Sequence, residues 1–510
     1  MTKQYYITTP LYYVNSPLTV GGAYTTIVAD VLARYQRLRG REVFFLTGSD
    51  EHGQKIQRAA EKEGLTPRKL ADRVVGTFLE LWQLLEISNS DFIRTTEKRH
   101  EDVVRKVFSQ LEERGDIYWG AYEGWYCTPC ETFLLESNLV EGKCPQCARP
   151  VERLAEENYF FRLTRYQEQL RHHFSRSRDF VMPPSRFREV FNRLEEGLND
   201  ISVSRAGGWG IPVPGRPEQT IWVWFDALLN YISALDPFSD ERLFNTVWPA
   251  DIHLMAKDIL WFHSILWPAM LLALELPLPR RIFAHGWWTM GGEKISKSKG
   301  KTVSAREMVE KFGPDPFRYF MLREIPLGGD GDFSFEALAG RYRSDLAHDL
   351  GNLLQRSLSM VKKYRGGKIP GPGRNASGGN LLKKTIGFWG DYHRLMEDLL
   401  FNQALEGIWT LVKGANRFIE ERKPWKLARD PLKADRLDET LFTLSAVLLQ
   451  AAAMIRPFMP GTAAGICRQL NPDLKGPPEF SEAASRPMEI LQSGGAIGRI
   501  EPLFPLEEGK

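Results

Sequence analysis

The chain has 510 residues, of which 43% are hydrophobic and 26% are charged. This length is too great for one ordinary core, so two to four domains are expected, and the near-average composition excludes a disordered or fibrous chain. The formal net charge is only +3, so overall charge does not indicate a nucleic-acid partner.

The N-terminus shows no basic segment followed by an apolar one, and we therefore expect no secretion signal. The longest apolar stretch, about Ile259 to Leu278, contains His263, Glu275 and two prolines. A buried helix explains it better than a membrane span does. The sequence predicts a cytoplasmic protein without membrane association.

A strand–helix–strand unit opens the chain. Gln4–Pro10 has the pattern of a strand, Thr25–Arg39 that of a helix, and Glu42–Thr47 that of a second strand. A parallel crossover places binding loops at the carboxyl ends of its strands. The first candidate site therefore comprises residues 10–22 and 48–53.

The remaining elements follow in three blocks. From about Asp116 to Ser204 the pattern is irregular, with short strands and turns, and is typical of an insertion. The α/β pattern then resumes with strands Thr220–Phe225, Asp251–Ala256 and Arg281–Trp288 and helix Ile259–Leu274. Beyond about Asp345, amphipathic helices interrupted at Gly366–Gly379 predict an all-α domain. The tail from about Pro472 is poorly patterned and is expected to drape back over the rest. The fold class is thus α/β, a Rossmann-type parallel sheet with an insertion and a C-terminal helical domain.

Four cysteines form two closely spaced pairs, Cys127-x-x-Cys130 and Cys144-x-x-Cys147. This spacing is typical of a tetrahedral Zn²⁺ site, and four thiolate ligands close the coordination sphere, so the metal would be structural. Two disulfides or unliganded reduced cysteines are the alternatives. Both fit a cytoplasmic chain poorly, because thiols there stay reduced and rarely cluster in this way.

Each of two basic segments can be explained either as solvent-exposed surface or as a phosphate-binding site. Between about Arg341 and Arg429 basic residues outnumber acidic ones, which fits a solvated helical face or a phosphate-binding face. The segment Lys294-Ile295-Ser296-Lys297-Ser298 is either exposed surface or a polyphosphate-binding loop, with two ammonium groups and further hydroxyl and N–H donors.

These segments carry a resemblance to the class I aminoacyl-tRNA synthetases. Lys294 to Ser298 matches the KMSKS signature of that class with one conservative change. The likeness is closest to the methionyl-tRNA synthetases, through Thr9 to Asn15, Gly48 to Gly53, Trp224 to Tyr231 and His253 to Trp267. It extends from Tyr6 to about Leu470 in the family's order, which random matching does not explain.

The resemblance implies a set of binding residues. The methionine-pocket positions fall on Leu11, Tyr13, Asp50, Trp224, Ala227, Tyr231, Ile259, Phe262, His263 and Trp267. Aromatic and aliphatic walls suit a thioether, Tyr and His provide polar groups near sulfur, and an Asp pairs with the ammonium group. Any one of the aromatics is better explained as ordinary core, but the whole set is not. The anticodon-reading positions fall on Asn352, Arg356 and Trp425, where core or surface-pair roles are the alternative.

The ATP site departs from the family. The HIGH signature is replaced by Thr19-Val20-Gly21-Gly22, so that both histidines that touch the ATP phosphates are absent, and Ala256 replaces the glycine before Lys257-Asp258. Loss of one preorganised donor costs roughly 2.7–4 kcal/mol of transition-state stabilisation, and two losses in one cluster need not add. Because the Thr19 hydroxyl, the N–H groups of Gly21 and Gly22 and both lysines remain, we expect slow activation and not its abolition.

The resemblance implies a ligase that condenses L-methionine with ATP, supplied with Mg²⁺, and transfers the methionyl group to tRNA(Met). Lys294 and Lys297 would neutralise the pyrophosphate, and Asp258 would hold the ribose. The alternative is a weak or inactive relative that binds methionine or tRNA, or delivers methionine to another acceptor. Synthetases for isoleucine, valine or leucine are disfavoured, because only about ninety residues separate Asp116 from Ser204.

Six segments and a monomeric state are expected. The absence of an appended C-terminal dimerisation domain favours the monomer. The segments are a first Rossmann half at 1–115, the zinc-bearing insertion at 116–204, a second Rossmann half at 205–290, the KMSKS loop and stem-contact region at 291–345, the anticodon-binding domain at 346–470 and a tail at 471–510.

Overall fold

The computed structural model describes residues 3–127, 132–134, 139–145, 148–291, 293–295, 303–372, 379–474, 480, 490–491 and 495–506. The chain divides into two units. The first comprises Met1–Ala29, Arg41–Gln83 and Ser88–Gly286, and the second comprises Asp30–Gly40, Leu84–Ile87 and Trp287–Lys510.

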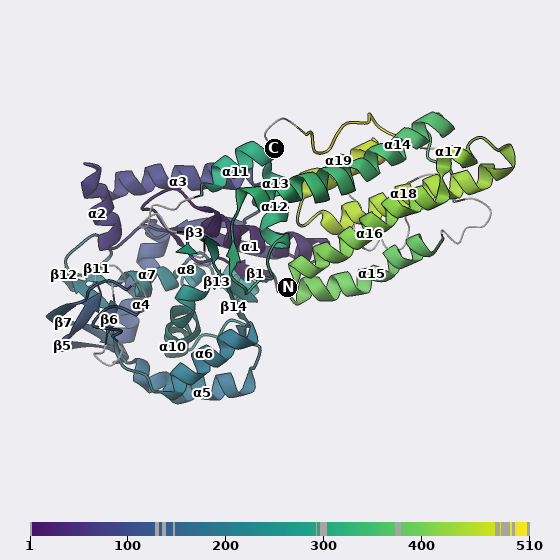
Figure 1. Ribbon diagram of the computed structural model, residues 1–510. Helices are drawn as coiled ribbons and strands as arrows, with labels where there is room; N and C mark the ends of the chain where they lie inside the picture. Colours follow the sequence, from purple (N-terminus) through teal and green to yellow (C-terminus); the bar gives the residue numbers. More distant parts are fainter. Residues whose placement is uncertain are drawn as a thin grey trace. The chain divides into compact units, whose positions relative to one another are not determined.

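A seven-stranded parallel sheet lies at the centre of the first unit (Figure 1). Its strands follow the order β2-β3-β1-β13-β14-β8, and β4 also pairs with β3. The sheet confirms the predicted α/β class with a Rossmann-type core. The strands are β1 Tyr5–Thr8, β2 Tyr12–Tyr13, β3 Val43–Asp50, β4 Asp91–Arg94, β8 Val181–Met182, β13 Ile252–Ala256 and β14 Ile282–His285.

The predicted strand–helix–strand unit is confirmed, with different bounds. Helix α1 (Val20–Leu38) connects β1 to its parallel neighbour β3, and Tyr5 pairs with Val43. The helix begins at Val20, before the predicted Thr25. The prediction missed the first turn because Gly21 and Gly22 carry no apolar side chain and so hide its helical periodicity. Helices α2 (Gln54–Lys62), α3 (Pro67–Leu84) and α4 (Lys98–Glu113) follow β3 and β4 along the chain.

Residues 116–204 contain more regular structure than their pattern predicts. An antiparallel sheet has the order β6-β5-β7-β9, and β8 joins the parallel sheet beside β14. The helices here are short and amphipathic. Their helical periodicity extends over too few residues to be distinguished from that of the surrounding loops. The elements are β5 Ile117–Cys127, β6 Thr132–Leu134, β7 Glu152–Phe161, α5 Gln167–Arg176, α6 Pro184–Glu195 and β9 Ile201–Ser202.

The predicted strand Thr220–Phe225 is a strand only at its first two residues. Strand β12 (Arg216–Ile221) ends at Ile221, in a small antiparallel sheet with β10 (Ser204–Ala206) and β11 (Pro212–Val213), and Val223–Leu228 forms helix α7 instead. A short continuous apolar run does not distinguish a strand from a buried helix. Two more helices follow, α8 Asn230–Ser233 and α9 Glu241–Val247.

The helix predicted at Ile259–Leu274 forms in three parts. A short 3₁₀ turn at Lys257–Ile259 leads to a π-helical segment, Phe262–Leu266, and then to α10 (Trp267–Ala273). Such π-helical turns occur frequently at functional sites. The predicted strand Arg281–Trp288 is likewise divided, between β14 and β15 (Trp288–Met290), which belong to different sheets.

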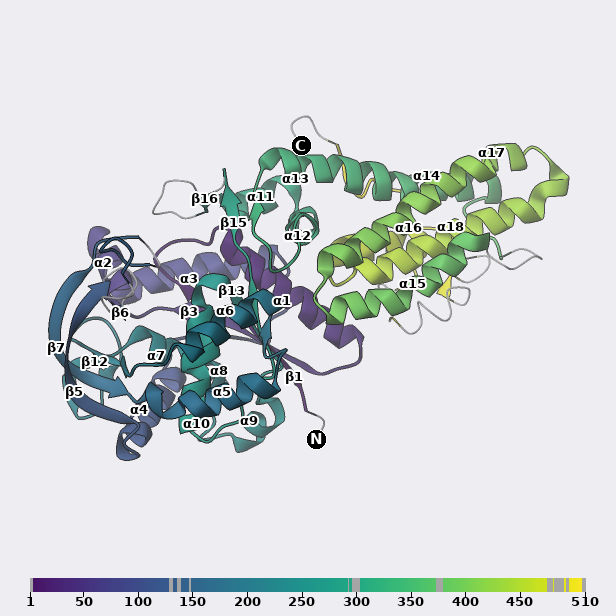
Figure 2. The same cartoon turned by 60° about the horizontal axis from the view of Figure 1, so that its bottom comes forward.

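The second unit is mainly helical, as predicted, and its long helices α14, α15, α16 and α18 run side by side (Figures 1 and 2). A three-stranded sheet of β15, β16 (Glu293–Lys294) and β17 (Gly331–Asp332) precedes them. The π-helical segment Tyr342–Gly351 joins α13 to α14. The helices are α11 Ala305–Phe312, α12 Pro314–Arg323, α13 Phe335–Arg341, α14 Asn352–Arg365, α15 Gly379–Glu397, α16 Phe401–Arg422, α17 Pro424–Leu427, α18 Ala434–Ile455 and α19 Pro460–Leu470.

One described helix, Pro431–Ile455, is long and apolar enough to cross a membrane, with a mean hydropathy of 1.3 in its most apolar window. The apolar stretch noted in the sequence, about Ile259 to Leu278, contains only a shorter apolar helix, Phe262–Ala273. Of the window in Pro431–Ile455, 89% is buried inside the structure, as in a core helix.

The described part of the tail drapes back over the second unit, as predicted. The N–H of Ile369 donates to the Gly495 carbonyl oxygen at 3.0 Å, and the N–H of Ile497 donates to that of Gly367 at 2.8 Å. The side chain of Phe480 packs against Trp389 and Tyr392.

Candidate functional site

The first-unit site lies where adjacent parallel strands end. β1 pairs with β3 on one side and with β13 on the other, so the loops that follow these neighbouring strands lie on either side of the end of β1. Ligands of open α/β sheets bind outside the carboxyl ends of the strands at such a switch point. Residues 9–22, 51–53 and 257–259 follow these ends. The first two segments overlap the predicted 10–22 and 48–53, but residues 48–50 still belong to β3.

Aromatic side chains from α7, α8, the π-helical segment and α10 gather into one cluster. Trp224 stacks on Phe262 with ring centroids 3.9 Å apart, and the ring of Tyr231 lies 5.7 Å from that of Trp267. Phe262 belongs to the main buried core of this unit, and Ala227 is also buried. Leu11, Tyr13, Trp224 and Ile259 are only partly buried and pack against that core, so these four side chains keep a surface open to a ligand.

A hydrogen bond of 2.7 Å joins Tyr231 Oη to His263 Nε2. His263 Nδ1 lies 3.0 Å from the Ile259 carbonyl oxygen. Because a carbonyl only accepts, Nδ1 carries the proton and Nε2 accepts from Tyr231. Burial lowers the pKa of His263 to about 4 and raises the pKa of Tyr231. The pair is therefore neutral near pH 7 and suits an uncharged, polarizable ligand group.

A second layer fixes this aromatic cluster. Trp267 Nε1 donates to His253 Nε2 at 3.2 Å, so that Nδ1 of His253 carries its proton and donates to Thr8 Oγ1 at 2.6 Å. The hydroxyl of Tyr6 donates to the carbonyl oxygen of Tyr231 at 2.8 Å. Strands β1 and β13 thereby hold the rings of Trp267 and Tyr231 in place.

Asp50 ends β3, and its side chain is only 4% exposed. Tyr13, at the end of β2, is its register partner, and the Nζ atom of Lys55 lies 4.2 Å from the centre of the Tyr13 ring. Two residues before Asp50, a Cβ atom on Gly48 would lie 2.0 Å from the Ile93 carbonyl oxygen, so only glycine lets β3 and β4 approach here. The end of β3 that carries Asp50 therefore packs closely against β4.

The residues predicted to bind ATP lie at the start of α1 and the end of β13. Gly21 and Gly22 occupy the first turn of α1, and Thr19 directly precedes the helix. Ala256 ends β13 in an extended conformation, and Asp258 is exposed in the turn that follows. Backbone N–H groups at the start of a 19-residue helix attract phosphate.

The predicted polyphosphate loop belongs to the second unit. Lys294 lies on β16, where its register partner is Thr289 of β15. Lys297 lies outside the described residues, as do the neighbouring residues 296–302.

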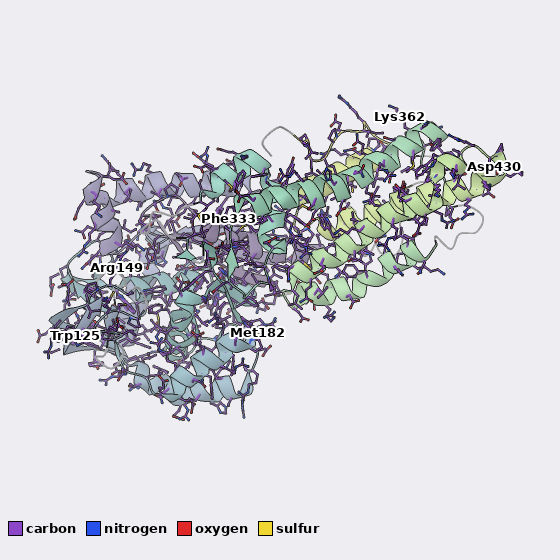
Figure 3. All side chains as sticks on the ribbon, viewed as in Figure 1. Trp125, Arg149, Met182, Phe333, Lys362 and Asp430 are labelled. Carbon is purple, nitrogen blue, oxygen red and sulfur yellow. The ribbon has the colours of Figure 1, made fainter. Side chains whose placement is uncertain are left out.

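Two of the four predicted zinc ligands are described. Cys127 and Cys144 are buried together with Leu134 in a small cluster, to whose edge Trp125 packs (Figure 3 labels Trp125). Cys130 and Cys147 lie outside the described residues. Among the residues that the structure describes, no group of three or more His, Cys, Asp or Glu side chains has a metal-binding arrangement.

The predicted anticodon-reading residues lie on α14 and α17. Asn352 is exposed at the start of α14, and half-buried Arg356 forms an ion pair of 2.5 Å with Glu420 of α16. This is the surface-pair role that the sequence left open. Trp425 is half-buried on the one-turn helix α17, and Lys362 is exposed in the last turn of α14 (Figure 3).

Sequence reasoning missed a buried polar cluster beside the methionine positions. Asp226 accepts from His52 and from His100, and all three side chains are buried. Burial alone would raise the pKa of Asp226, but the two histidines outweigh it and hold that pKa below its ordinary value. His52 and Asp226 lie inside motifs that the resemblance used, but nothing in their spacing links them to each other or to His100.

Comparison with known proteins agrees with this architecture. The model of the family described as tRNA synthetases class I (M) matches residues 5–154 and 148–358. The methionine–tRNA ligase of Caldanaerobacter subterraneus is 47% identical over 99% of this chain and 79% of its own length, and that of Thermotoga maritima is 44% identical over 99% and 81%.

Solved structures match along nearly the whole chain as well. Mycobacterium tuberculosis methionyl-tRNA synthetase in complex with methionyl-adenylate has a TM-score of 0.94 at 38% identity, covering 99% of this chain and 100% of that one. The same protein's apo form has a TM-score of 0.86 at 35% identity, covering 99% and 98%. The fold and these matches define an enzyme of the aminoacyl-tRNA ligase class. Within that class, the chain belongs to the methionine-type family of class I tRNA synthetases.

Proposed function

We propose that the chain activates L-methionine with ATP and transfers the methionyl group to tRNA(Met). The methionine carboxylate oxygen attacks the α-phosphorus, the bond to pyrophosphate breaks, and the terminal adenosine hydroxyl of the tRNA then displaces AMP. The observation that carries this proposal is the neutral Tyr231–His263 pair within the Trp224, Phe262 and Trp267 rings, beside buried Asp50. It matches the amino acid in the names of the relatives.

Methionine binding divides between two parts of the site. The Asp50 carboxylate pairs with the ammonium group, and Trp224, Phe262 and Trp267 enclose the thioether with Leu11, Tyr13, Ala227 and Ile259 around them. The Tyr231 hydroxyl and the His263 ring offer polar edges to sulfur without a charge. No side-chain nucleophile is needed, since positioning and electrostatics supply the catalysis.

ATP use is proposed to be slow. Lys294 and Lys297 neutralise charge developing on pyrophosphate, Asp258 holds the ribose, and the first turn of α1 receives phosphate. Thr19 and Gly22 stand where the family has its histidines, and each lost donor costs about 10²- to 10³-fold in rate. Mg²⁺ enters with ATP and shields its phosphates.

Methionine-dependent exchange of pyrophosphate into ATP tests the proposed function. Separate calorimetric titrations with methionine and with ATP accompany it, and we expect normal binding of the first and weakened binding of the second. Methionine and tRNA binding without exchange would instead favour a binding protein, or one that passes methionine to another acceptor. The lost histidine pair is the observation that keeps this second function open.

We also propose a structural Zn²⁺ held by Cys127, Cys130, Cys144 and Cys147. Cys127 and Cys144 share one buried cluster at the edge of the β5–β6 hairpin, which fits a metal that stabilises the insertion. The purified protein should contain about one equivalent of zinc, and Cys127→Ser should lower the thermal stability of the insertion with little direct change in methionine binding. A metal-free protein whose Cys127 and Cys144 are alkylated in the native state would refute this.

The anticodon is proposed to bind Asn352, Arg356 and Trp425. Trp425→Ala removes a stacking surface and should weaken tRNA(Met) binding by roughly 1–3 kcal/mol while methionine affinity stays the same. Filter binding with tRNA and calorimetry with methionine measure the two affinities. Equal losses of both would assign Trp425 to the core.

A further inference from the structure

The carboxylate of Asp226 is shared by two histidines from different elements. His52 Nδ1 lies 2.7 Å from Asp226 Oδ2, and His100 Nε2 lies 2.6 Å from Oδ1. The side chains of Asp226 and His100 are fully buried, and that of His52 is 4% exposed. A carboxylate buried in this way is stable only because both of its oxygens receive charged or polar hydrogen bonds.

The three residues join three segments of the first unit. His52 lies in the loop after β3, His100 in the first turn of α4, and Asp226 on α7. His100 also bonds to Ser233 Oγ of α8 at 2.7 Å. The cluster therefore connects the loop that follows Asp50 to both helices that carry Trp224, Ala227 and Tyr231.

The other side of the same loop is held separately. Glu51, next to Asp50, accepts from Arg94 Nε at 2.5 Å and from Thr96 Oγ1 at 2.5 Å. The Trp209 indole N–H donates to the Glu51 carbonyl oxygen at 2.6 Å. Glu51 thus fixes the loop to the end of β4, which leaves His52 as its link to the helices of the aromatic cluster.

This arrangement sets the distance between the β3 side and the α7–α8 side of the proposed methionine site. The ammonium group of methionine binds on the β3 side, and the thioether binds on the α7 and α8 side. The substrate spans both, so a shift of one side relative to the other removes one contact or the other. The Asp226 cluster spans the same gap with buried, directional hydrogen bonds.

We propose that Asp226, through His52 and His100, is a positioning residue for methionine that fixes the Asp50 loop against the α7–α8 wall. This inference rests on the proposed function. Asp226 acts through its neighbours and not on the reacting atoms. Its loss should therefore affect methionine binding first, because no residue of the proposed ATP site belongs to the three segments that it joins.

Asp226→Asn tests this, because the amide keeps the size of the carboxylate but loses one of its two acceptor oxygens. The methionine Kd by calorimetry, and KM in pyrophosphate exchange, should rise about 10- to 100-fold, the scale expected for misplacement within a binding site. The KM for ATP should change less than about twofold, a split that general unfolding would not produce.

Asp251→Asn is the matched control. Asp251 is also buried, accepts from the Tyr6 N–H and from Arg280 at 2.9 Å each, and directly precedes β13 at the amino end of the sheet. It should lower thermal stability without changing the methionine Kd. An unchanged Kd in Asp226→Asn, or an equal rise in both variants, would overturn the proposal.

A second pair of variants decides the question if Asp226→Asn does not fold. In His52→Asn the side-chain amide nitrogen replaces Nδ1 as donor to Asp226, whereas His52→Ala removes it. The alanine variant should weaken methionine binding and the asparagine variant should largely retain it, and equal affinities would contradict the proposal. Absence of methionine binding by the parent protein would instead refute the proposed function itself.

Discussion

Asp50→Asn is expected to weaken methionine binding by at least about 100-fold. Asp50 is 4% exposed at the end of β3, where the substrate ammonium group would enter a site with little water. Removing one partner of a buried ion pair costs about 3–5 kcal/mol, because the remaining charge stays uncompensated. Calorimetric titration of parent and variant with methionine measures the effect.

A methionine analogue without the amino group provides the control. The analogue should bind the parent protein weakly, and Asp50→Asn should bind it no worse, because the group that Asp50 pairs with is absent. Equal weakening of methionine and analogue would contradict the assignment and indicate that Asp50 acts by holding the fold of the loop. Melting curves of parent and variant separate that outcome from unfolding.

The parallel core was predictable from the sequence for a physical reason. Strands buried on both faces are continuous apolar runs, as in Phe44 to Leu46 of β3 and Leu254 to Met255 of β13, and a helical period between them requires a crossover. The crossover in turn predicts where binding loops meet. The pattern alone therefore predicted the first candidate loops, without the resemblance. It did not predict the correct bounds of α1.

The errors arise where local pattern and tertiary contacts disagree. The run Ile221 to Leu229 is apolar at every position except Asp226, and most of α7 is buried, so the run shows neither the period of a strand nor that of an amphipathic helix. Strand β8 has two residues and is a strand only because β14 lies beside it. The Asp226 cluster depends on contacts between segments far apart in sequence, which no spacing rule expresses.

Restoring the two histidines, Thr19→His with Gly22→His, is expected to raise methionyl-adenylate formation by up to about 100-fold, since each histidine supplies one donor to the charge that develops on ATP. The backbone tolerates the change. Gly22 lies in the first turn of α1, and a Cβ atom there would come within 2.7 Å only of Leu18 Cδ2, the end of a flexible side chain. Replacing a helical glycine also favours the helix by a few tenths of a kcal/mol.

The series should include Ala256→Gly, because the resemblance places a glycine, without a methyl group, at the position of Ala256. Ala256 has an extended backbone that glycine also adopts, so this change tests space at the nucleotide and not strain. Thr19 directly precedes α1, and its carbonyl oxygen accepts from the Ala23 N–H, so methionine binding serves as the control for folding. Pyrophosphate exchange should rise in the double variant and rise further with Ala256→Gly. If every variant binds methionine as the parent does and none activates it faster, then the missing histidines do not limit the rate, and a protein that binds methionine for a sensor or for another acceptor becomes the better account.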